Sequence, residues 1–403
     1  MIANLIQRLN ALEDIDISRL QDQERRDLLQ ACDRLKSKLE SPMDITARLM
    51  LSGHQAMAIR LSVDLKIFDA IAKISLSTDT FSVHDLYNEI GHAEPLLIAR
   101  LVRFLSAMSV VKEVDRDVYA QTPLAAAFVS SSLLAAAVIH GTYFMTILSK
   151  LPEYFHVKGW KSPGDAYDGP FNFTPTKSNT HYFDFLSSTP YYGQAFNAVM
   201  GMSFRRTGKD WFEFFPTERL QISNESEPLV VDIGGGNGND LKKLKTRFPC
   251  LSGKLILQDL PAVIECARDL QGIEVQSHDF FQVQPVRNAK VYFMRTVLHD
   301  WPDKQGVQIL RRIRDAMGRD SILLISELIL PESGVLLTSV LSDMQMMGTF
   351  SSLERTQEQW RALFEKADLQ LVKVWLPDSC DGSPNSLAQQ PALFETRLKP
   401  KNV

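Results

Sequence analysis

VVDIGGGNGND occupies residues 230–240, where three consecutive glycines follow a run rich in β-branched residues. Glycine lacks a Cβ atom, so it adopts left-handed backbone conformations and lets a ligand come close to the main chain. An apolar strand that ends in a glycine turn and continues as a helix is typical of nucleotide- and nucleoside-binding sheets. The stretch therefore predicts a strand, a turn and a helix, and the spacing of its glycines indicates which ligand the turn suits.

Gly234, Gly236 and Gly238 give the spacing GxGxG. A dinucleotide fingerprint needs its third glycine one residue later, where this sequence has Asn239. A P-loop needs Lys followed by Ser or Thr at the start of the helix, and GNGNDLKK has no such pair. The spacing argues against both phosphate-binding motifs, while a tight turn that binds nothing stays open at this point.

Two acidic residues follow at the ends of the next predicted strands. Asp259 lies 21 residues beyond Gly238, and Asp279 ends the third strand directly before Phe280. A carboxylate at the first position can accept hydrogen bonds from both ribose hydroxyls of a nucleoside. A carboxylate at the second can accept from the exocyclic amine of adenine, beside an aromatic ring that can stack on the base. These positions together predict a site for adenosine without phosphates.

The last 200 residues alternate apolar, β-branched segments with helical ones. We expect strands at 229–236, 254–260, 273–281, 289–298 and 321–330, and helices at 239–248, 262–270 and 303–317. Such alternation is typical of an α/β fold with a mostly parallel, Rossmann-like sheet that is buried on both faces. Ligands of such sheets bind beyond the carboxyl ends of the strands, which is where we expect the site.

The first half of the chain is predicted to be mainly helical. Apolar residues at three- and four-residue spacing predict two helices over 2–39, broken near DIDIS, and a helical block over 45–72 that is apolar on more than one face. Residues 81–125 have the outline of a winged helix, a short helix, a turn at Gly91, a longer helix and an alternating segment. Residues 133–203 are helical and rich in aromatic side chains. We expect a helical arm at 1–40, a winged-helix-like dimerisation and acceptor-pocket domain at 41–203, and the Rossmann-like domain at 204–403.

Composition excludes several classes of partner. A net charge of −4 argues against a nucleic-acid-binding protein, and the longer helix of the winged-helix outline offers only Arg100 and Arg103 as basic groups. The four cysteines have no CxxC pair and no histidine at metal-ligand spacing, so we expect no metal site. The N-terminus has no secretory signal, and the most apolar segment, SSLLAAAVIHGTYFMTIL, is interrupted by His140 and Gly141. We expect a cytoplasmic protein that acts on a small molecule, without a nucleic-acid or membrane partner.

A series of motifs resembles the S-adenosylmethionine-dependent O-methyltransferases of the caffeic acid O-methyltransferase type, in particular their fungal natural-product branch. They are LVVDIGGGNG, FPCLSGKLILQDLPAVIECA, HDFF, VYFMRTVLHDWPDKQ, LLISELILP and SSLERTQEQW, in this order. The resemblance covers most of residues 45–375 and implies S-adenosylmethionine as cofactor and a homodimer as the assembly. It places the cofactor-binding positions on Gly234, Gly236, Asp259, Asp279, Phe280 and Arg295, of which the last replaces a lysine common in plant members.

Methyl transfer to a hydroxyl needs an aligned acceptor and a base that takes the hydroxyl proton. His299 follows an apolar strand directly, and the pKa of an unperturbed histidine suits this task at neutral pH. Glu327 is flanked by apolar residues and needs a partner if it is buried, for which a cationic His299 is a candidate. The resemblance implies that Glu327 and Glu354 both flank the catalytic histidine. Glu354 also stands before a predicted helix start with Thr356 as its cap.

The sequence gives less information about the acceptor molecule and about the type of reaction than about the cofactor. The resemblance implies that Asp300 contacts the acceptor, and we expect Met200, Met344 and Met347 to border its pocket. Some fungal enzymes of this type retain the cofactor but catalyse dehydration and pericyclic ring closure, and Arg295 with His140 could polarise a carbonyl group in that way. The retained His299, Glu327 and Glu354 favour methylation. A regulator that only senses S-adenosylmethionine is a third alternative, which the missing basic surface disfavours.

Overall fold

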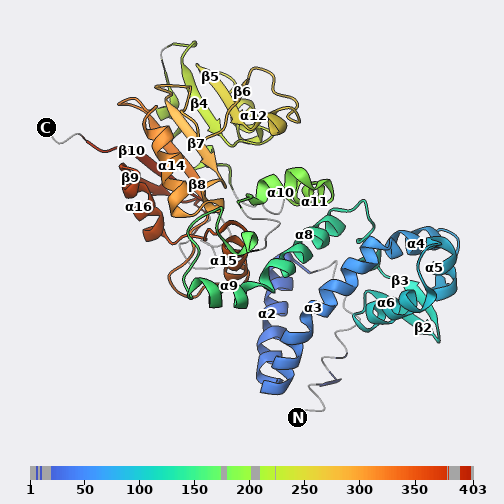
Figure 1. Ribbon diagram of the computed structural model, residues 1–403. Coiled ribbons are helices and arrows are strands. Elements are labelled where there is room, and N and C mark those ends of the chain that lie inside the picture. The colour runs from blue at the N-terminus through green and yellow to red at the C-terminus, as the bar shows by residue number, and fades with distance from the viewer. Residues whose placement is uncertain are drawn as a thin grey trace. The chain divides into compact units, whose positions relative to one another are not determined.

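The computed structural model describes residues 6–7, 10, 20–173, 179–200, 209–222, 224–378, 380 and 391–400. The chain divides into two compact units, Met1–Ala126 and Ala127–Val403 (Figure 1), which we describe separately. The aromatic-rich helices that follow residue 127 thus belong to the same unit as the large sheet. The boundaries expected at residues 40/41 and 203/204 separate the helical arm, the acceptor-pocket domain and the cofactor-binding domain by their expected functions. These functional boundaries stay predictions.

The first unit contains helices and a small antiparallel sheet in the order β1-β3-β2. The predicted short helix, Gly91 turn, longer helix and alternating segment are all present, and Gly91 ends its helix with φ of 74°. The predicted helical block over 45–72 is divided at Lys66, which has the left-handed φ of 56°. The break expected near DIDIS lies outside the described residues. The elements are α2 (Asp22–Leu39), α3 (Pro42–Asp64), α4 (Ile67–Ile74), β1 (Thr80–Ser82), α5 (Val83–Ile90), α6 (Pro95–Ala107), β2 (Val111–Asp115), β3 (Val118–Gln121) and α7 (Pro123–Ala126).

Helix α3 leaves much of its apolar surface uncovered. Its buried side chains are confined to the C-terminal half, at Ala58, Ser62 and Val63. The exposed apolar ones are Met43, Leu49, Met50, Leu51, Met57 and Leu61. An apolar surface of this kind is typical of a protein–protein interface.

The helices at the start of the second unit form an aromatic cluster. The most apolar segment of the chain is helix α8, and its Tyr143 and Phe144 pack with Tyr182 and with Phe350 of helix α15. Part of its apolar composition therefore serves packing in this cluster, whereas Leu133, Leu134 and Leu148 are exposed. The elements of this region are α8 (Leu133–Leu148), α9 (Leu151–Lys158), the 3₁₀ turn η2 (Pro170–Asn172), α10 (Tyr182–Ser188), α11 (Pro190–Met200) and α15 (Leu337–Phe350).

The large sheet of the second unit has the order β6-β5-β4-β7-β8-β10-β9 among the described residues. The first five strands are parallel, as predicted, and β10 pairs antiparallel with both β8 and β9. The sequence interpretation did not anticipate β9 or β10, and the helix predicted at 262–270 is only the four-residue α13 (Pro261–Ile264). The strands are β4 (Pro228–Ile233), β5 (Lys254–Asp259), β6 (Glu274–Ser277), β7 (Val291–Arg295), β8 (Ile322–Glu327), β9 (Leu369–Trp375) and β10 (Ala392–Leu398).

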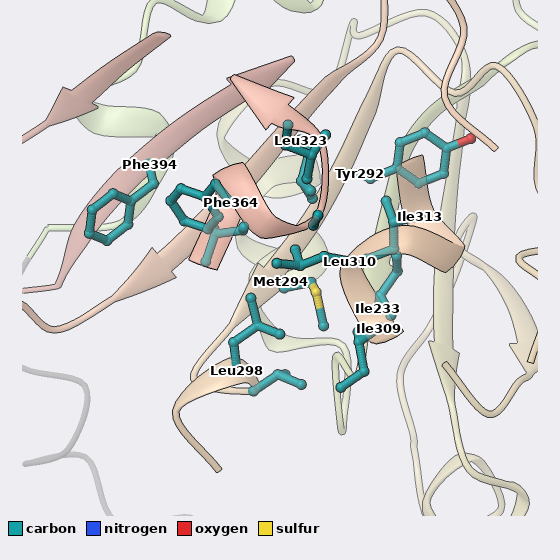
Figure 2. Packing of buried hydrophobic residues seen from close by; sticks show 14 of the residues in the cluster. Ile233, Tyr292, Met294, Leu298, Ile309, Leu310, Ile313, Leu323, Phe364 and Phe394 are labelled. Carbon is teal, nitrogen blue, oxygen red and sulfur yellow. The ribbon is translucent and has the colours of Figure 1, made fainter. Parts of the chain in front are cut away.

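Both faces of this sheet are buried. Helices α14 (Asp303–Arg314) and α16 (Gln357–Lys366) cover one face, where Ile309, Leu310 and Phe364 pack on Met294 and Phe394 (Figure 2). Helix α12 (Asn239–Arg247) and the turns η5 (Trp211–Glu213) and η6 (Thr217–Leu220) cover the other. Strand β4 pairs with β5 on one side and with β7 on the other. The chain thus changes direction beside β4, at the switch point where such sheets bind ligands.

The antiparallel strand β10 should contribute strongly to stability. Phe394 is fully buried, with its ring 5.6 Å from that of Trp360 and 5.7 Å from that of Phe364. We expect Phe394→Ala to lower the free energy of unfolding by about 3–5 kcal/mol, because it leaves a cavity in this cluster. Val157→Ala, at a position that is 63% exposed, should change it by less than about 0.5 kcal/mol. Chemical denaturation measures both, and similar effects for the two variants would contradict the prediction.

Candidate active site

The glycine turn follows β4 and adopts the backbone that its sequence predicts. Gly234, Gly236 and Gly238 have φ of 70°, 59° and 70°, the left-handed region that favours glycine. The N–H of Gly234 donates to the carbonyl of Gln258 at 2.8 Å, and that of Gly236 donates to Asp259 Oδ2 at 2.8 Å. The first predicted acid therefore lies directly against the turn, although its residue number is 23 higher than that of Gly236.

Asp232 lies beneath the turn and is a residue whose importance the sequence interpretation missed. Its side chain is 1% exposed, and Oδ2 has no hydrogen-bond partner among the described residues. Burial raises its pKa well above the usual value, and the nearby Asp240 and Asp259 raise it further. A Cβ atom on Gly235 would lie 2.5 Å from Asp232 Oδ2 and 2.5 Å from Leu257 Cδ1, so only glycine fits at that position.

Charges around the turn are predominantly negative. Arg295, at the end of β7, forms an ion pair of 2.7 Å with Asp240 in the first turn of α12. The positive charge of Arg295 is therefore compensated by Asp240 beside the glycine turn. Asp232 and Asp259 add two more carboxyl groups, and burial raises the pKa of Asp259. A surplus of carboxyl groups is unsuited to a phosphate but suits a ligand with a sulfonium and an ammonium group. The residues present therefore fit S-adenosylmethionine.

The second predicted acid and its aromatic neighbour lie close to the same turn. Asp279 Oδ1 accepts a hydrogen bond from the N–H of Phe281 at 2.9 Å, which fixes the start of this loop. Phe280 Cε1 lies 3.8 Å from where a Cβ atom of Gly234 would be. The ring of Phe280 also meets Trp301 edge-on at 5.8 Å. Phe280 and Trp301 thus provide aromatic surface next to the turn, and Trp301 was not among the predicted site residues.

His299 lies in the short 3₁₀ turn η7 (Leu298–Asp300) that follows β7. Its Nδ1 is 3.5 Å from Glu354 Oε1, and its Nε2 is 3.5 Å from Asp300 Oδ1. Burial by itself would lower the pKa of His299, but the carboxylates of Asp300, Glu327 and Glu354 outweigh it and raise the pKa to about 10. The three predicted acids do surround this histidine, and without ligands they favour its protonated form.

Glu327 acts on the backbone of the histidine turn. Its Oε1 accepts hydrogen bonds from the N–H groups of Val297, Leu298 and His299 at 3.0, 2.9 and 3.3 Å. The sequence interpretation proposed the cationic side chain of His299 as its partner. The imidazole ring itself lies against Glu354 and Asp300, and its positive charge acts on Glu327 as well, so the proposed charge interaction is present in addition to these backbone hydrogen bonds. Burial raises the pKa of Glu327 to about 7, with the charge on His299 opposing the rise.

Arg355 holds the same turn from its other side and was missed in the sequence. Its guanidinium is fully buried and donates to the carbonyls of Leu298 at 3.1 Å and Trp301 at 2.8 Å. It also pairs with Asp303 at 3.0 Å. Thr356 caps α16 as predicted, accepting from the N–H of Gln359. In the sequence, Arg355 is only a charged residue between Glu354 and the helix cap Thr356. Nothing in this pattern shows that its side chain is buried.

Two further residues complete the surroundings of His299. Ser342 Oγ donates to Glu354 Oε1 at 2.8 Å, and a cavity of about 190 Å³ lies beside this pair. His181, 3% exposed, stacks on Trp301 with ring centres 4.4 Å apart and an angle of 9°. Burial lowers the pKa of His181 to about 4, so its imidazole is neutral at pH 7. No sequence motif singled out either residue.

The residues predicted to line the acceptor pocket lie on three helices that pack together, α8, α11 and α15. His140 is 7% exposed and packs edge-on against Phe144 and Phe196, at 4.7 and 5.4 Å. Met200 is the last residue of α11, whereas Met344 and Met347 lie on α15. Their contact with an acceptor stays a prediction.

Comparisons with known proteins agree on one family. Residues 189–370 match the model of the O-methyltransferase domain, and residues 47–131 match that of the O-methyltransferase dimerisation domain. Demethylsterigmatocystin 6-O-methyltransferase of Aspergillus flavus is 30% identical to this chain, over 84% of this chain and 86% of that protein. A solved structure described as a pericyclic reaction enzyme is 27% identical, with a TM-score of 0.79 over 99% of this chain and 100% of its own. LepI in complex with S-adenosylmethionine is likewise 27% identical, with a TM-score of 0.80 over 99% of this chain and 100% of that chain.

Two glycines of the turn should respond differently to alanine. In Gly235→Ala the new Cβ atom meets Asp232 and Leu257 at 2.5 Å, so the turn must move. A Cβ atom on Gly236 meets nothing within 4 Å, and only its φ of 59° opposes alanine, at about 1–2 kcal/mol. We expect Gly235→Ala to weaken binding of S-adenosylhomocysteine at least tenfold more than Gly236→Ala, as measured by calorimetry. Equal losses would mean that backbone strain, and not the space above Asp232, limits the turn.

Proposed function

Because this chain belongs to the family of S-adenosylmethionine-dependent O-methyltransferases, we propose that it methylates a hydroxyl group of an aromatic or polyketide-type secondary metabolite. The observation that carries this proposal is the position of His299. The histidine lies between Glu354 and Asp300 just beyond β7, and the glycine turn lies just beyond the neighbouring strand β4. A base and a cofactor site on adjacent parallel strands suit a transfer between two ligands.

The roles that we propose follow from these positions. S-adenosylmethionine, when bound, supplies a methyl group on a cationic sulfur. Asp259 would bind its ribose and Asp279 its adenine amine, with Phe280 beside the base and the buried carboxyl groups near the turn favouring its positive charges. Arg295 would set the position of Asp240 at the start of α12. Holding both reactants in line supplies most of the acceleration that we expect.

His299 would take the hydroxyl proton at Nε2 while Glu354 orients the ring through Nδ1. A base must be neutral to act, yet the carboxylates around His299 raise its pKa to about 10. A positive charge bound in the neighbouring site disfavours a second one on the imidazole, so it lowers that pKa. We propose that the base becomes competent when the cofactor site is filled. A general base of this kind contributes about 10²–10⁴-fold to the rate.

The surroundings of the acceptor support a flat, largely apolar substrate. Aromatic side chains of α8, α10, α11 and α15 pack around His140 and Phe196. We further propose a cytoplasmic homodimer, which the matched dimerisation domain and the exposed apolar side chains of α3 support. An interface that covers α3 would remove this apolar surface from water.

A pericyclic reaction that leaves the methyl group in place is the competing proposal. The similarity to a pericyclic reaction enzyme and the presence of Arg295 and His140 are its support. Two observations weigh against it. Arg295 is paired with Asp240, which diminishes the field that it offers a substrate, and the whole set of His299, Glu327 and Glu354 is in place for proton removal.

The reaction is tested with S-adenosylmethionine labelled in its methyl group and a mixture of phenolic and polyketide acceptors. We expect label in an acceptor, and we expect His299→Ala to lower the rate of its transfer by about 10²–10⁴-fold because the base is lost. His156→Ala, on the exposed surface of α9, serves as the matched control. Turnover of an acceptor without label in the product would support the pericyclic reaction, and transfer by His299→Ala within about tenfold of wild type would exclude the base role.

The carboxylate of Glu354 should set the pH dependence of the reaction. Anionic neighbours raise the pKa of His299, so neutralising one of them must lower it. In Glu354→Gln the acid limb of the kcat/KM profile should therefore move to lower pH, while the plateau falls because the ring loses its orienting partner. Glu358→Gln removes a 75% exposed carboxylate of α16 and should leave the limb in place. A limb that stays fixed in Glu354→Gln would show that His299 is not the group being titrated.

A further inference from the structure

Three polar side-chain atoms at the start of α10 and in α15 are buried without a hydrogen-bond partner among the described residues. They are His181 Nε2, Tyr182 Oη and Thr349 Oγ1. Their side chains are at most 3% exposed. Most buried polar groups in folded proteins are hydrogen-bonded, and an unpaired one costs about 1–3 kcal/mol. Three such groups in one region therefore call for an explanation.

The three residues contact Phe350 or adjoin it in the sequence. The ring of Phe350 lies 5.8 Å from that of His181 and 5.3 Å from that of Tyr182, and Thr349 precedes it in α15. Although α10 and α15 are far apart in the sequence, they bring these groups together in one aromatic cluster. Aromatic rings surround them, and the hydroxyl groups of Tyr143 and Tyr192 lie close enough to Tyr182 to act on its pKa, yet no hydrogen bond to Tyr182 Oη is formed among the described residues.

This cluster is attached to the turn that carries His299 at two points. His181 stacks on Trp301, two residues beyond His299. Ser352, two residues beyond Phe350, donates through Oγ to the carbonyl oxygen of His299 at 2.5 Å. The cluster is thus linked to the histidine turn through Trp301 and through Ser352.

The protonation of His181 defines what it can bind. Its Nδ1 accepts a hydrogen bond from the N–H of Phe183 at 3.3 Å, so in the neutral ring the proton is on Nε2. Burial lowers its pKa to about 4, which keeps the ring neutral across the physiological range. Nε2 is therefore a donor and needs an oxygen that accepts, whereas the hydroxyls of Tyr182 and Thr349 can donate or accept.

We propose that His181, Tyr182 and Thr349 are specificity-determining residues that bind oxygen substituents of the acceptor. The acceptor class that follows is a polyoxygenated aromatic polyketide, with a carbonyl or ether oxygen for His181 and two further oxygens besides the methylated hydroxyl. This rests on the proposed function, and it makes these residues selective against less oxygenated aromatic molecules. A site with buried polar groups rejects an analogue that leaves them unpaired.

The proposal predicts opposite effects on stability and on binding. Tyr182→Phe and Thr349→Val each remove one unpaired hydroxyl and keep the shape of the side chain. Because the group removed is unpaired in the free protein, the Tm should stay the same or rise. Tyr292→Phe is the matched control, because its hydroxyl is hydrogen-bonded, with the carbonyl oxygens of Val286 and Ala316 as acceptors for its one proton at 2.7 and 3.0 Å. The control should lower the Tm and leave ligand selectivity unchanged.

The experiment measures binding of a tetrahydroxyanthraquinone and a monohydroxyanthraquinone to the full chain in the presence of S-adenosylhomocysteine. We expect wild type to bind the first at least tenfold more tightly, and Tyr182→Phe and Thr349→Val each to reduce that ratio by about fivefold or more. His181→Phe, which keeps the stack on Trp301, should act in the same direction. Binding does not require methyl transfer, so a failed label assay would reject the proposed function without deciding this proposal. An unchanged ratio, or a lowered Tm in both Tyr182→Phe and Thr349→Val, would overturn it and assign these hydroxyls to the fold.

Discussion

Two buried charges of opposite sign hold the turn on which the proposed chemistry depends. Glu327 accepts from three consecutive N–H groups at residues 297–299, and Arg355 donates to the carbonyls of Leu298 and Trp301. A single 3₁₀ turn has few internal hydrogen bonds and would not hold a fixed geometry alone. A charge on each side compensates its unpaired backbone groups and satisfies each buried charge at the same time. The position of His299 is thus a consequence of β8 and of the segment before α16.

Buried and partly buried charged groups also surround the glycine turn, but here acidic groups outnumber basic ones. Asp232, Asp240 and Asp259 gather around a glycine turn that leaves no room for a side chain at Gly235. Arg295 compensates one of these acids, and burial raises the pKa of two others. Such an arrangement is costly for the empty protein and becomes favourable when a cation enters. We propose that the same cation acts on His299, which would couple the binding of the cofactor to the readiness of the base through charge.

The aromatic helices contribute shape, and their few polar atoms contribute selectivity. Rings from α8, α10, α11 and α15 pack against one another around Tyr182 and Phe350. Unpaired polar atoms within such a cluster lower stability, and we propose that they are retained because a ligand pairs them. His181 belongs to both regions, because it stacks on Trp301 of the histidine turn and lies beside Phe350 of the helical cluster.

The sequence by itself determined the parts of the protein that are local. Glycine spacing, apolar strands and the caps at Gly91 and Thr356 each depend on residues close together in the chain, and the structure has all of them. The parallel part of the sheet and the acid beside the glycine turn were also predictable, since strand ends meet at one edge. The antiparallel strands β9 and β10 were not, because β10 joins the sheet by pairing with β8 across the intervening helices α15 and α16.

Only the tertiary structure decided which charges meet. Glu327 lies 28 to 30 residues from the amides that it binds, and Arg355 lies 54 and 57 residues from its carbonyls. The sequence named His299, Glu327 and Glu354 as a group but did not reveal that Glu327 binds the backbone of the histidine turn, and it missed Arg355, Asp232 and His181. Burial turns an ordinary side chain into a strong determinant of structure or binding, because an enclosed polar group must find a partner. No periodicity in the sequence reports where enclosure occurs, and the packing of distant segments alone establishes it.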